Sequence, residues 1–345
     1  MEKFLTGIYN NDNGEGIFSF QMKDNGQLKL TNSYIINNPS YIIKSRKNNH
    51  MYTVTENGSG DGLSFVTAFS IFSDSLSETG RSYSGQNGIT FIAEDIRSEF
   101  LVTANYGSGS ISVFCIEENG TISNEKQIIK FTGHGTYPER QEQPHIHCIV
   151  FTPDGEYVFA TDLGTDHIYR YELDYSNKEK FINEQSLKKY KMKNGAGPRH
   201  MCFHPDGKKV FLINELDCSI ISFIYSNGEL LQTAEYTANR EWKDADGGAL
   251  KISPDGKKIY TSFRNYNDGV AEFNIEDFNG RLSLRNYIRT GSHPRDINIS
   301  SDGKFLFVAS MNDNEIEIFK IKDTYRSADR FAKIQLNSPA CICLL

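Results

Sequence analysis

The segment SPDGKKIYTSFR, residues 253–264, joins a turn to a strand. Pro, Asp and Gly reverse the chain between strands, and the residues that follow are rich in apolar and β-branched types. Similar segments begin at residues 152, 204 and 300, and an apolar run precedes each of them. Their turn aspartates are 52, 49 and 47 residues apart: Asp154, Asp206, Asp255 and Asp302. Each segment therefore predicts a β-hairpin, and the near-continuous apolar second strands indicate burial on both faces.

Weaker copies of the hairpin lie upstream, at 40–57 and 89–106, and half a copy opens the chain at 4–10. Counting second strands gives seven repeats of about 49 residues, the size of a four-stranded propeller blade. The opening copy lacks a first strand, and the C-terminal run PACICLL (339–345) lacks a partner. We therefore predict one all-β domain over residues 1–345. It is a seven-bladed β-propeller of four-stranded antiparallel blades, closed by the C-terminal strand pairing into the N-terminal blade.

Composition excludes several classes of protein. A formal net charge of -7 argues against a nucleic-acid partner. No run of about 18 apolar residues suggests a membrane span, and the N-terminus lacks an apolar signal core. The six cysteines form no CxxC pair and most lie in apolar runs, which is typical of reduced thiols. These features predict a cytoplasmic protein without a membrane partner, and we expect a monomer or a weak homodimer.

Polar residues collect where, in a propeller, first strands begin and second strands end. The starts of first strands carry RQEQPHIH (140–147), GAGPRH (195–200), DADGG (244–248) and SHPRD (292–296). The ends of second strands carry Glu56, Asn105, Asp162, Glu215 and Arg264. Because both sets share one face of a propeller, we expect arginines, histidines and carboxylates to converge on a single polar pocket.

His145 and His147 are two residues apart on a strand, so they point to the same face. An HxH pair can bind a metal, with Asp162 and Asp166 in the same repeat, but no third ligand has suitable spacing. A pair that only lines the channel is a second alternative. We favour a catalytic or substrate-binding role, with His147 as the catalytic residue, and expect neither a metal nor an organic cofactor.

The charged candidates also have structural alternatives. Glu215 follows a buried strand, so it either forms an ion pair with Arg199 or Arg264 or acts in catalysis, and the two roles are compatible. The arginines could offset neighbouring acids, but four of them at one mouth favour binding of an anion. His200 is expected to point away from Arg199 and pack between blades. His204 lies in a turn on the opposite face and is expected to be structural.

These motifs resemble the bacterial lactonase family of seven-bladed propellers. The resemblance rests on RQEQPHIH with TPDGEYVFATDLGTDHIYRYELD, on GAGPRHMCFHPDGKKVFLINEL, on HPRDINISSDGKFLFVA and on VTANYGSGSISVF. It covers nearly the whole chain, and the four motifs in this order are specific. The family includes propeller-type 6-phosphogluconolactonases, and fungal carboxymuconate cyclases are relatives. The resemblance implies a carboxylic ester hydrolase of carbohydrate metabolism, in the pentose phosphate pathway, that opens an anionic sugar lactone without a cofactor.

The resemblance also suggests roles for individual residues. It maps the family's pocket to Arg140, a histidine of PHIH, Arg199, Glu215, Arg264 and Arg295. Within this set we expect His147, Glu215, Arg199 and Arg264 to be catalytic, with His147 or Glu215 as the base. Substrate binding is expected of seven residues: Arg140, Arg295, His145, Gln141, Asp162, Asn105 and Glu56. The chain departs from the family pattern at Phe263, where Asn is usual, and at Ser310 and Met311, where an Asn-Gln pair is usual.

Two other functions stay open at this point. A muconate-lactonising cyclase or isomerase could use the same arginines for the carboxylates of its substrate. A propeller without enzymatic activity could bind a small anion or a partner protein there. Product formation from a carboxymuconate would support the first alternative. Substitutions in the pocket that leave every tested turnover unchanged would support the second.

Overall fold

The computed structural model describes residues 2–10, 14–47, 49–56, 64–72, 75–237, 245–322 and 328–345. The strands of this part of the chain form seven four-stranded antiparallel sheets, and none of these residues forms a helix. This confirms the predicted fold class. The chain divides into two compact units, residues 1–10, 17–33 and 199–345 in the first and 11–16 and 34–198 in the second. Asp244, which begins the predicted DADGG segment, lies outside the described residues.

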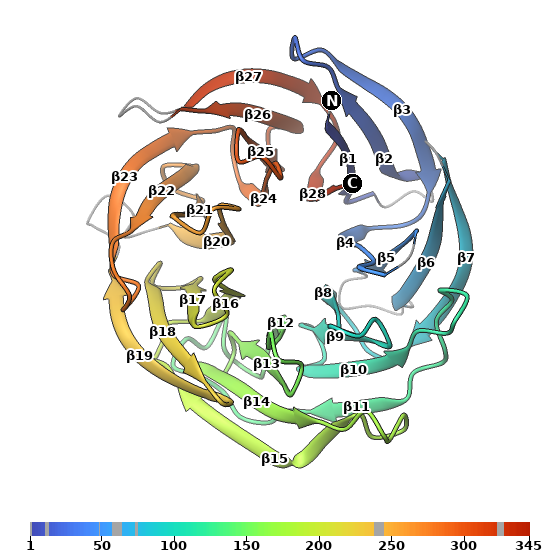
Figure 1. Cartoon of the computed structure of the whole chain (residues 1–345), viewed down its shortest axis with the longest axis vertical. Coiled ribbons are helices and arrows are strands. Elements are labelled where there is room, and N and C mark those ends of the chain that lie inside the picture. Colours follow the sequence, from blue (N-terminus) through green and yellow to red (C-terminus); the bar gives the residue numbers. More distant parts are fainter. Residues whose placement is uncertain are drawn as a thin grey trace. The chain divides into compact units, whose positions relative to one another are not determined.

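The second unit holds three sheets whose strands follow one another in chain order (Figure 1). The first contains β4 (Pro39–Lys44), β5 (His50–Thr55), β6 (Ser64–Phe72) and β7 (Ser75–Ser84). The next contains β8 (Ile89–Glu94), β9 (Phe100–Asn105), β10 (Ser110–Cys115) and β11 (Gln127–Lys130). The last contains β12 (Ile146–Phe151), β13 (Tyr157–Asp162), β14 (His167–Leu173) and β15 (Ile182–Lys191).

The first unit holds the other four sheets. In three of them the strands again follow chain order. One contains β16 (Pro198–Phe203), β17 (Lys209–Asn214), β18 (Ile220–Ser226) and β19 (Glu229–Tyr236), and the next contains β20 (Asp246–Ile252), β21 (Lys258–Arg264), β22 (Gly269–Ile275) and β23 (Leu282–Arg289). The third contains β24 (Pro294–Ile299), β25 (Phe305–Ser310), β26 (Glu315–Ile321) and β27 (Ala328–Gln335). The fourth sheet has the order β28 (Pro339–Leu344), β1 (Glu2–Ile8), β2 (Glu15–Met22) and β3 (Leu28–Ile35).

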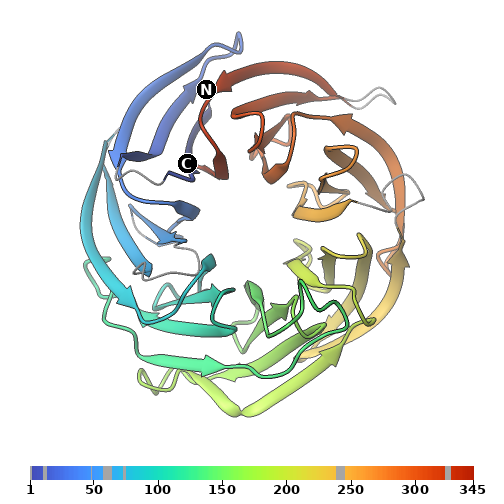
Figure 2. The same cartoon turned by 180° about the vertical axis from the view of Figure 1, so that it is seen from behind.

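The two ends of the chain meet in that fourth sheet, as predicted. Strand β28 pairs antiparallel with β1, with Phe4 opposite Leu344 and Thr6 opposite Ile342. Both views place the N- and C-terminal strands side by side (Figure 1, Figure 2). This pairing covers the edge of β1 that would otherwise present unpaired backbone groups.

The repeated turns share one hydrogen-bonding scheme. In the first, Oδ1 of Asp154 accepts hydrogen bonds from Oγ1 of Thr152 at 2.5 Å and from the backbone N–H of Glu156 at 3.0 Å. The next residue, Gly155, has a φ of 74°, which a residue with a Cβ adopts only at a cost. The same hydroxyl–aspartate pair closes the turns at Ser253–Asp255 (2.6 Å) and Ser300–Asp302 (2.7 Å).

The fourth turn has a histidine in place of the hydroxyl. Nδ1 of His204 accepts the backbone N–H of Asp206 at 3.1 Å, and Nε2 donates to the carbonyl of Gly256 at 2.7 Å. Both ring nitrogens are therefore used to hold two turns together. This geometry supports the interpretation of His204 as a structural residue.

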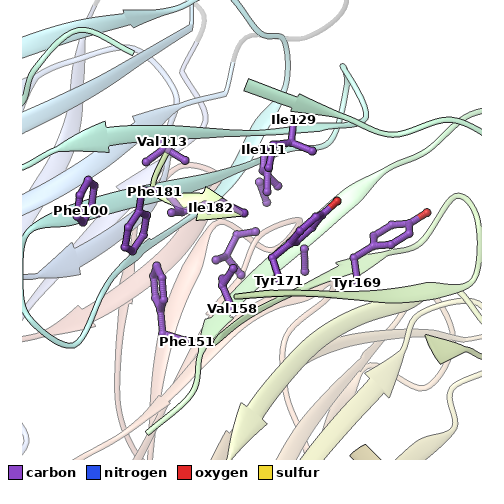
Figure 3. Close-up of a cluster of buried hydrophobic side chains, with 14 of the residues drawn as sticks. Phe100, Ile111, Val113, Ile129, Phe151, Val158, Tyr169, Tyr171, Phe181 and Ile182 are labelled. Carbon is purple, nitrogen blue, oxygen red and sulfur yellow. The ribbon is translucent and has the colours of Figure 1, made fainter. Parts of the chain in front are cut away.

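The core of the second unit shows why the second strands are so apolar. One cluster of buried side chains lies between the β8–β11 sheet and the β12–β15 sheet (Figure 3). In this cluster the rings of Phe100 and Phe181 stack with centroids 3.7 Å apart and planes 7° from parallel. Strand β17 of the first unit is buried at all six positions. Burial of both faces is what the apolar runs predicted.

The described residues can be compared with the expectations about cysteines and membrane spans. No disulfide joins any of the six cysteines, and five of them are buried. None of the described residues belongs to a helix long and apolar enough to cross a membrane.

Candidate functional site

Charged side chains of the first unit gather where second strands end and first strands begin. Arg199 is the second residue of β16, and Glu215 directly follows β17. Arg264 is the last residue of β21, while His293 and Arg295 lie at the start of β24. In an antiparallel pair, the start of one strand lies beside the end of the other. These residues of three consecutive sheets therefore lie close together at the strand ends.

Arg199 and Arg264 hold the same carboxylate oxygen. Nε of Arg199 donates to Oε2 of Glu215 at 2.8 Å, and Nη2 of Arg264 lies 3.1 Å from that oxygen. Arg199 is 2% exposed, and Glu215 and Arg264 are each 4% exposed. The ion pair considered for Glu215 thus exists with both arginines, and two guanidinium groups share one carboxylate.

The first of these arginines stays charged although it is buried. Burial and the positive charge of Arg264 lower the pKa of Arg199 to about 10, and Glu215 acts in the opposite direction. A group with this pKa is protonated at neutral pH. Arg199 therefore carries its positive charge under the conditions in which an enzyme would work.

A histidine lies at each end of the arginine–glutamate–arginine chain. Nε2 of His200 is 3.0 Å from Nη1 of Arg199, and Nε2 of His293 is 3.3 Å from Nη1 of Arg264. A guanidinium can only donate, so each histidine accepts through Nε2. His200 was expected to pack away from Arg199, and the structure shows that its Nε2 nevertheless contacts the guanidinium of Arg199.

His293 is the residue that sequence reasoning missed. The SHPRD segment was recognised, but only Arg295 was selected from it. Burial and the charges of Arg264, Arg295 and Arg199 lower the pKa of His293 to about 3, against the effect of Glu215. The ring is therefore neutral at physiological pH, and it belongs to the arginine cluster rather than to a separate acid–base pair.

Arg295 stands at the edge of this cluster. Its guanidinium lies over the ring of Tyr9, 4.9 Å from the ring centroid, and Tyr9 follows β1 directly. The side chain is only partly buried. A cation over an aromatic face keeps its charge while its position is restricted, which suits a group expected to hold the distal part of a substrate.

The predicted histidine pair lies in the second unit and surrounds Tyr106. The ring of His145 stacks on that of Tyr106, with centroids 4.2 Å apart, and the ring of His147 meets it edge-on at 5.6 Å. Nδ1 of His145 lies 3.0 Å from the carbonyl of Tyr106, and Nε2 lies 3.0 Å from Oε1 of Glu142. Both ring nitrogens of His145 face oxygen acceptors, and the catalytic role of His147 stays a prediction. Tyr106 and Glu142 stood in the quoted motifs but were not selected.

Asp162 organises the loop that follows β13. Oδ1 accepts the backbone N–H groups of His145 at 2.7 Å and Gly164 at 2.9 Å. Oδ2 accepts a hydrogen bond from Oγ1 of Thr165 at 2.5 Å. Burial raises the pKa of Asp162, and these hydrogen bonds act against that shift. A role in substrate binding stays a prediction, and the contacts seen here position His145.

Gln141 is buried in the same loop. Its Oε1 accepts the backbone N–H groups of Thr136 and Tyr137 at 3.0 and 3.1 Å. Its Nε2 donates to the carbonyl of Leu163 and to Oδ1 of Asp166, both at 2.7 Å. The amide thus holds the RQEQPHIH segment against the end of β13, and its predicted contact with substrate stays a prediction.

The three remaining candidates occupy different settings. Asn105 is fully buried, and its amide contacts Oγ1 of Thr103 and the hydroxyls of Ser110 and Ser112 at 2.8–3.0 Å. Arg140 is partly buried in the turn before β12, and Glu56 is partly buried after β5. Their predicted roles as substrate contacts are not decided by these positions.

The structure also shows the contacts of residues at the two places where this chain departs from the family pattern. Phe263 is fully buried in an apolar cluster of the first unit, and Oγ of Ser310 donates to Oε2 of Glu317 at 2.7 Å. An amide nevertheless reaches the arginine cluster, because Oδ1 of Asn265 lies 3.1 Å from Nδ1 of His293. The arginine cluster therefore has an amide neighbour, although neither Phe263 nor Ser310 supplies one.

Within the described ranges, no group of three or more His, Cys, Asp or Glu side chains has the arrangement of a metal site. The absence of a cofactor remains a prediction. We expect prolonged dialysis against EDTA to leave the rate of lactone hydrolysis within about twofold, since the proposed chemistry uses only protein groups. Loss of activity that Zn²⁺ or Mg²⁺ restores, and that His145→Ala also causes, would contradict this.

Seven antiparallel four-stranded sheets, with an arginine cluster at the strand ends, define a β-propeller with a candidate anion site. The chain belongs to the family described as Lactonase, 7-bladed beta-propeller, which matches residues 3–344. This confirms the resemblance seen in the sequence.

Curated relatives and solved structures extend the similarity over the full chain. The 6-phosphogluconolactonase of Bacillus subtilis is 29% identical over 358 residues, covering 100% of this chain and 99% of that protein. The 6-phosphogluconolactonase of Formosa agariphila is 33% identical over 312 residues, covering 89% and 88%. A crystal structure from Bacteroides fragilis, provisionally named a 6-phosphogluconolactonase, has a TM-score of 0.92 at 33% identity, covering 100% and 98%.

Proposed function

We propose that this protein hydrolyses an anionic sugar lactone, with 6-phosphogluconolactone as the substrate and 6-phosphogluconate as the product. The observation that carries the proposal is the pair of buried arginines on one Glu215 oxygen. Three guanidinium groups outnumber the carboxylates Glu215 and Asp296 that act on them, and burial raises the pKa of Asp296. A phosphate monoester carries a charge of about -1.5 to -2 at pH 7 and suits such a site. The names of the relatives support the same substrate.

In the proposed reaction, water adds to the lactone carbonyl carbon and gives up one proton to a base. Glu215 and His147 are the two candidates for that base. The negative charge that develops on the carbonyl oxygen is stabilised by Arg199 or Arg264, a contribution of about 3 kcal/mol for a well-placed donor. The tetrahedral intermediate then expels the ring oxygen, which takes up a proton as the ring opens. Arg140 and Arg295 are assigned to the phosphate.

One buried donor also suits a bound anion. Nε of Arg264 is buried and, among the described residues, has no hydrogen-bond acceptor. An unsatisfied buried donor costs about 1–3 kcal/mol, so an oxygen of the substrate that reached it would be favoured. The other two nitrogens of this guanidinium are directed at Glu215 and His293.

The proposed function is tested by following acid release from purified lactones. We expect rapid turnover of 6-phosphoglucono-δ-lactone and much slower turnover of glucono-δ-lactone, which lacks the phosphate. A carboxymuconate serves as the third substrate. Conversion of the carboxymuconate, or equal rates with and without the phosphate, would overturn the assignment. The proposal also places the enzyme in the cytoplasm as a monomer or weak homodimer, which cell fractionation and sedimentation would examine.

Single arginine substitutions should separate binding from chemistry. Arg140→Ala and Arg295→Ala are expected to raise KM with a smaller effect on kcat, because a distal contact is nearly equal in ground state and transition state. Arg199→Ala and Arg264→Ala are expected to lower kcat by about 10² or more, because their charge meets the developing oxyanion. Steady-state kinetics on 6-phosphoglucono-δ-lactone measure both effects.

The control for this series is Arg281→Ala, since Arg281 is a highly exposed arginine that pairs with Asp277 on the surface. His147→Gln tests the base: if His147 accepts the proton, activity in the parent falls as the ring protonates, and the variant lacks that acid-side limb. Four arginine variants with kcat/KM within about twofold of the parent would rule out the pocket, since a charged hydrogen bond contributes about 1.5–3 kcal/mol.

A further inference from the structure

The backbone at His293 is held in an unusual conformation. Its φ is 56°, in the left-handed region, which residues other than glycine and asparagine adopt infrequently. The backbone N–H donates to Oδ1 of Asp268 at 3.0 Å, and the carbonyl accepts the N–H of Met311 at 3.0 Å. Oγ of Ser292 donates to Oδ2 of Asp268 at 3.2 Å. The surrounding loop therefore fixes the backbone position from which the imidazole side chain of His293 extends.

Hydrogen bonds also determine which ring nitrogen of His293 carries the proton. Arg264 only donates, so Nε2 accepts from Nη1 across 3.3 Å. Nδ1 then carries the hydrogen and donates to Oδ1 of Asn265 at 3.1 Å. The amide of Asn265 is itself oriented, because its Nδ2 donates to Oδ2 of Asp246 at 2.5 Å. A chain from Asp246 to Arg264 thus points the imidazole lone pair at the guanidinium.

The guanidinium of Arg264 is consequently held from two sides by partners of different charge. Glu215 binds Nη2 at 3.1 Å and contributes a negative charge, which Arg199 shares. His293 binds Nη1 and contributes no charge, because burial and the three nearby arginines keep its ring neutral far below neutral pH. A second carboxylate in place of His293 would hold Arg264 more firmly but would cancel the excess positive charge of the cluster.

We propose that His293 is a positioning residue for Arg264, an uncharged acceptor that orients the guanidinium without neutralising it. This inference rests on the proposed function, in which Arg264 acts on an anionic substrate. His293 itself neither takes nor gives a proton during turnover. Its contribution is to restrict Arg264 to one orientation before substrate arrives, so that this ordering does not have to occur in the transition state.

Two substitutions of similar polarity separate positioning from backbone effects. His293→Asn keeps a residue that tolerates a positive φ and can still reach Asn265, but its amide is too short to reach Arg264. His293→Gln places its amide oxygen near the position of Nε2. We expect the Asn variant to lower kcat about tenfold or more with KM within about threefold. We expect the Gln variant to recover kcat to within about threefold of the parent.

A third substitution, His293→Glu, tests the charge. Isothermal titration with inorganic phosphate measures anion binding without any need for turnover. The Glu variant is expected to bind phosphate at least about tenfold more weakly than the parent, whereas the Gln variant should bind it within about threefold. Thermal melting of all variants shows whether each is folded, and the phosphate titration gives an independent answer if the Asn variant is unstable.

Three results would overturn the role of His293. Equal kcat in the Asn and Gln variants would show that the acceptor at Nε2 does not matter. Unchanged phosphate affinity in the Glu variant would show that the charge at this position does not matter. Loss of the acid-side limb in the Gln variant would make His293 a base. If the parent hydrolyses no lactone, the proposed function fails by itself, and the phosphate titrations still decide whether His293 sets the charge at Arg264.

Discussion

Replacing Glu215 by alanine is expected to lower the free energy of unfolding by about 3–5 kcal/mol, the usual cost of leaving buried charges without their partner. The carboxylate is 4% exposed and receives Arg199 at 2.8 Å and Arg264 at 3.1 Å on one oxygen. Without it, two buried guanidinium groups face each other with no anion between them. Urea denaturation at pH 7 measures the loss. Lactone hydrolysis should fall by about 10² or more as the arginines lose their orientation.

The control for Glu215→Ala is Glu179→Ala. Glu179 also forms an ion pair, with Lys126 at 3.0 Å, but its side chain is 69% exposed. Exposed pairs contribute about 0–1 kcal/mol, so this variant should unfold like the parent. Glu215→Gln should fall between the two, because a neutral amide oxygen can still accept from one arginine. If Glu215→Ala unfolds within about 1 kcal/mol of the parent, the buried network does not stabilise the fold.

Deletion of residues 339–345 should prevent folding or lower stability by about 5 kcal/mol or more, from lost apolar burial and unpaired backbone groups. Five of the six residues of β28 are buried. Ile342 also joins the neighbouring β24 strand: its N–H donates to Oδ2 of Asp296 and its carbonyl accepts Nδ2 of Asn298, at 2.9 and 3.0 Å. Urea titration monitored by fluorescence and circular dichroism measures the effect. One coincident transition in the full chain would support the predicted single domain.

A point substitution keeps this prediction testable if the truncated chain does not fold. Ile342→Ala should cost about 2–5 kcal/mol, as expected for a large side chain in a packed core. Leu231→Ala removes a similar side chain that is 66% exposed and should cost no more than about 0.5 kcal/mol. A truncated protein that unfolds at the same urea concentration as the full chain would refute closure of the β1–β2–β3 sheet by β28.

Predicted strand ends and the family resemblance together identified part of the candidate site. Arg199, Glu215 and Arg264 were selected from strand ends, and the structure brings all three into direct contact. His293 was passed over because a histidine beside a proline in a loop has no periodic signal. Its importance comes from Arg264, which is 29 residues away in the chain and 3.3 Å away in the fold.

The sequence by itself determined the repeats, because local chemistry encodes them: an aspartate and a glycine, preceded by a hydroxyl in three turns and by His204 in the other, form each turn, and apolar runs form the strands beside it. It also determined that the two chain ends pair, since each was half of an incomplete blade. Only the tertiary structure decided which polar residues share hydrogen bonds. The predicted substrate contacts of Gln141 and Asp162 stay predictions, and the structure adds that both side chains bind loop backbone. His200 looked structural, yet it contacts Arg199. The reason is physical: strand alternation sets the face of a side chain, but partners across sheets depend on side-chain reach and on how buried charges are shared.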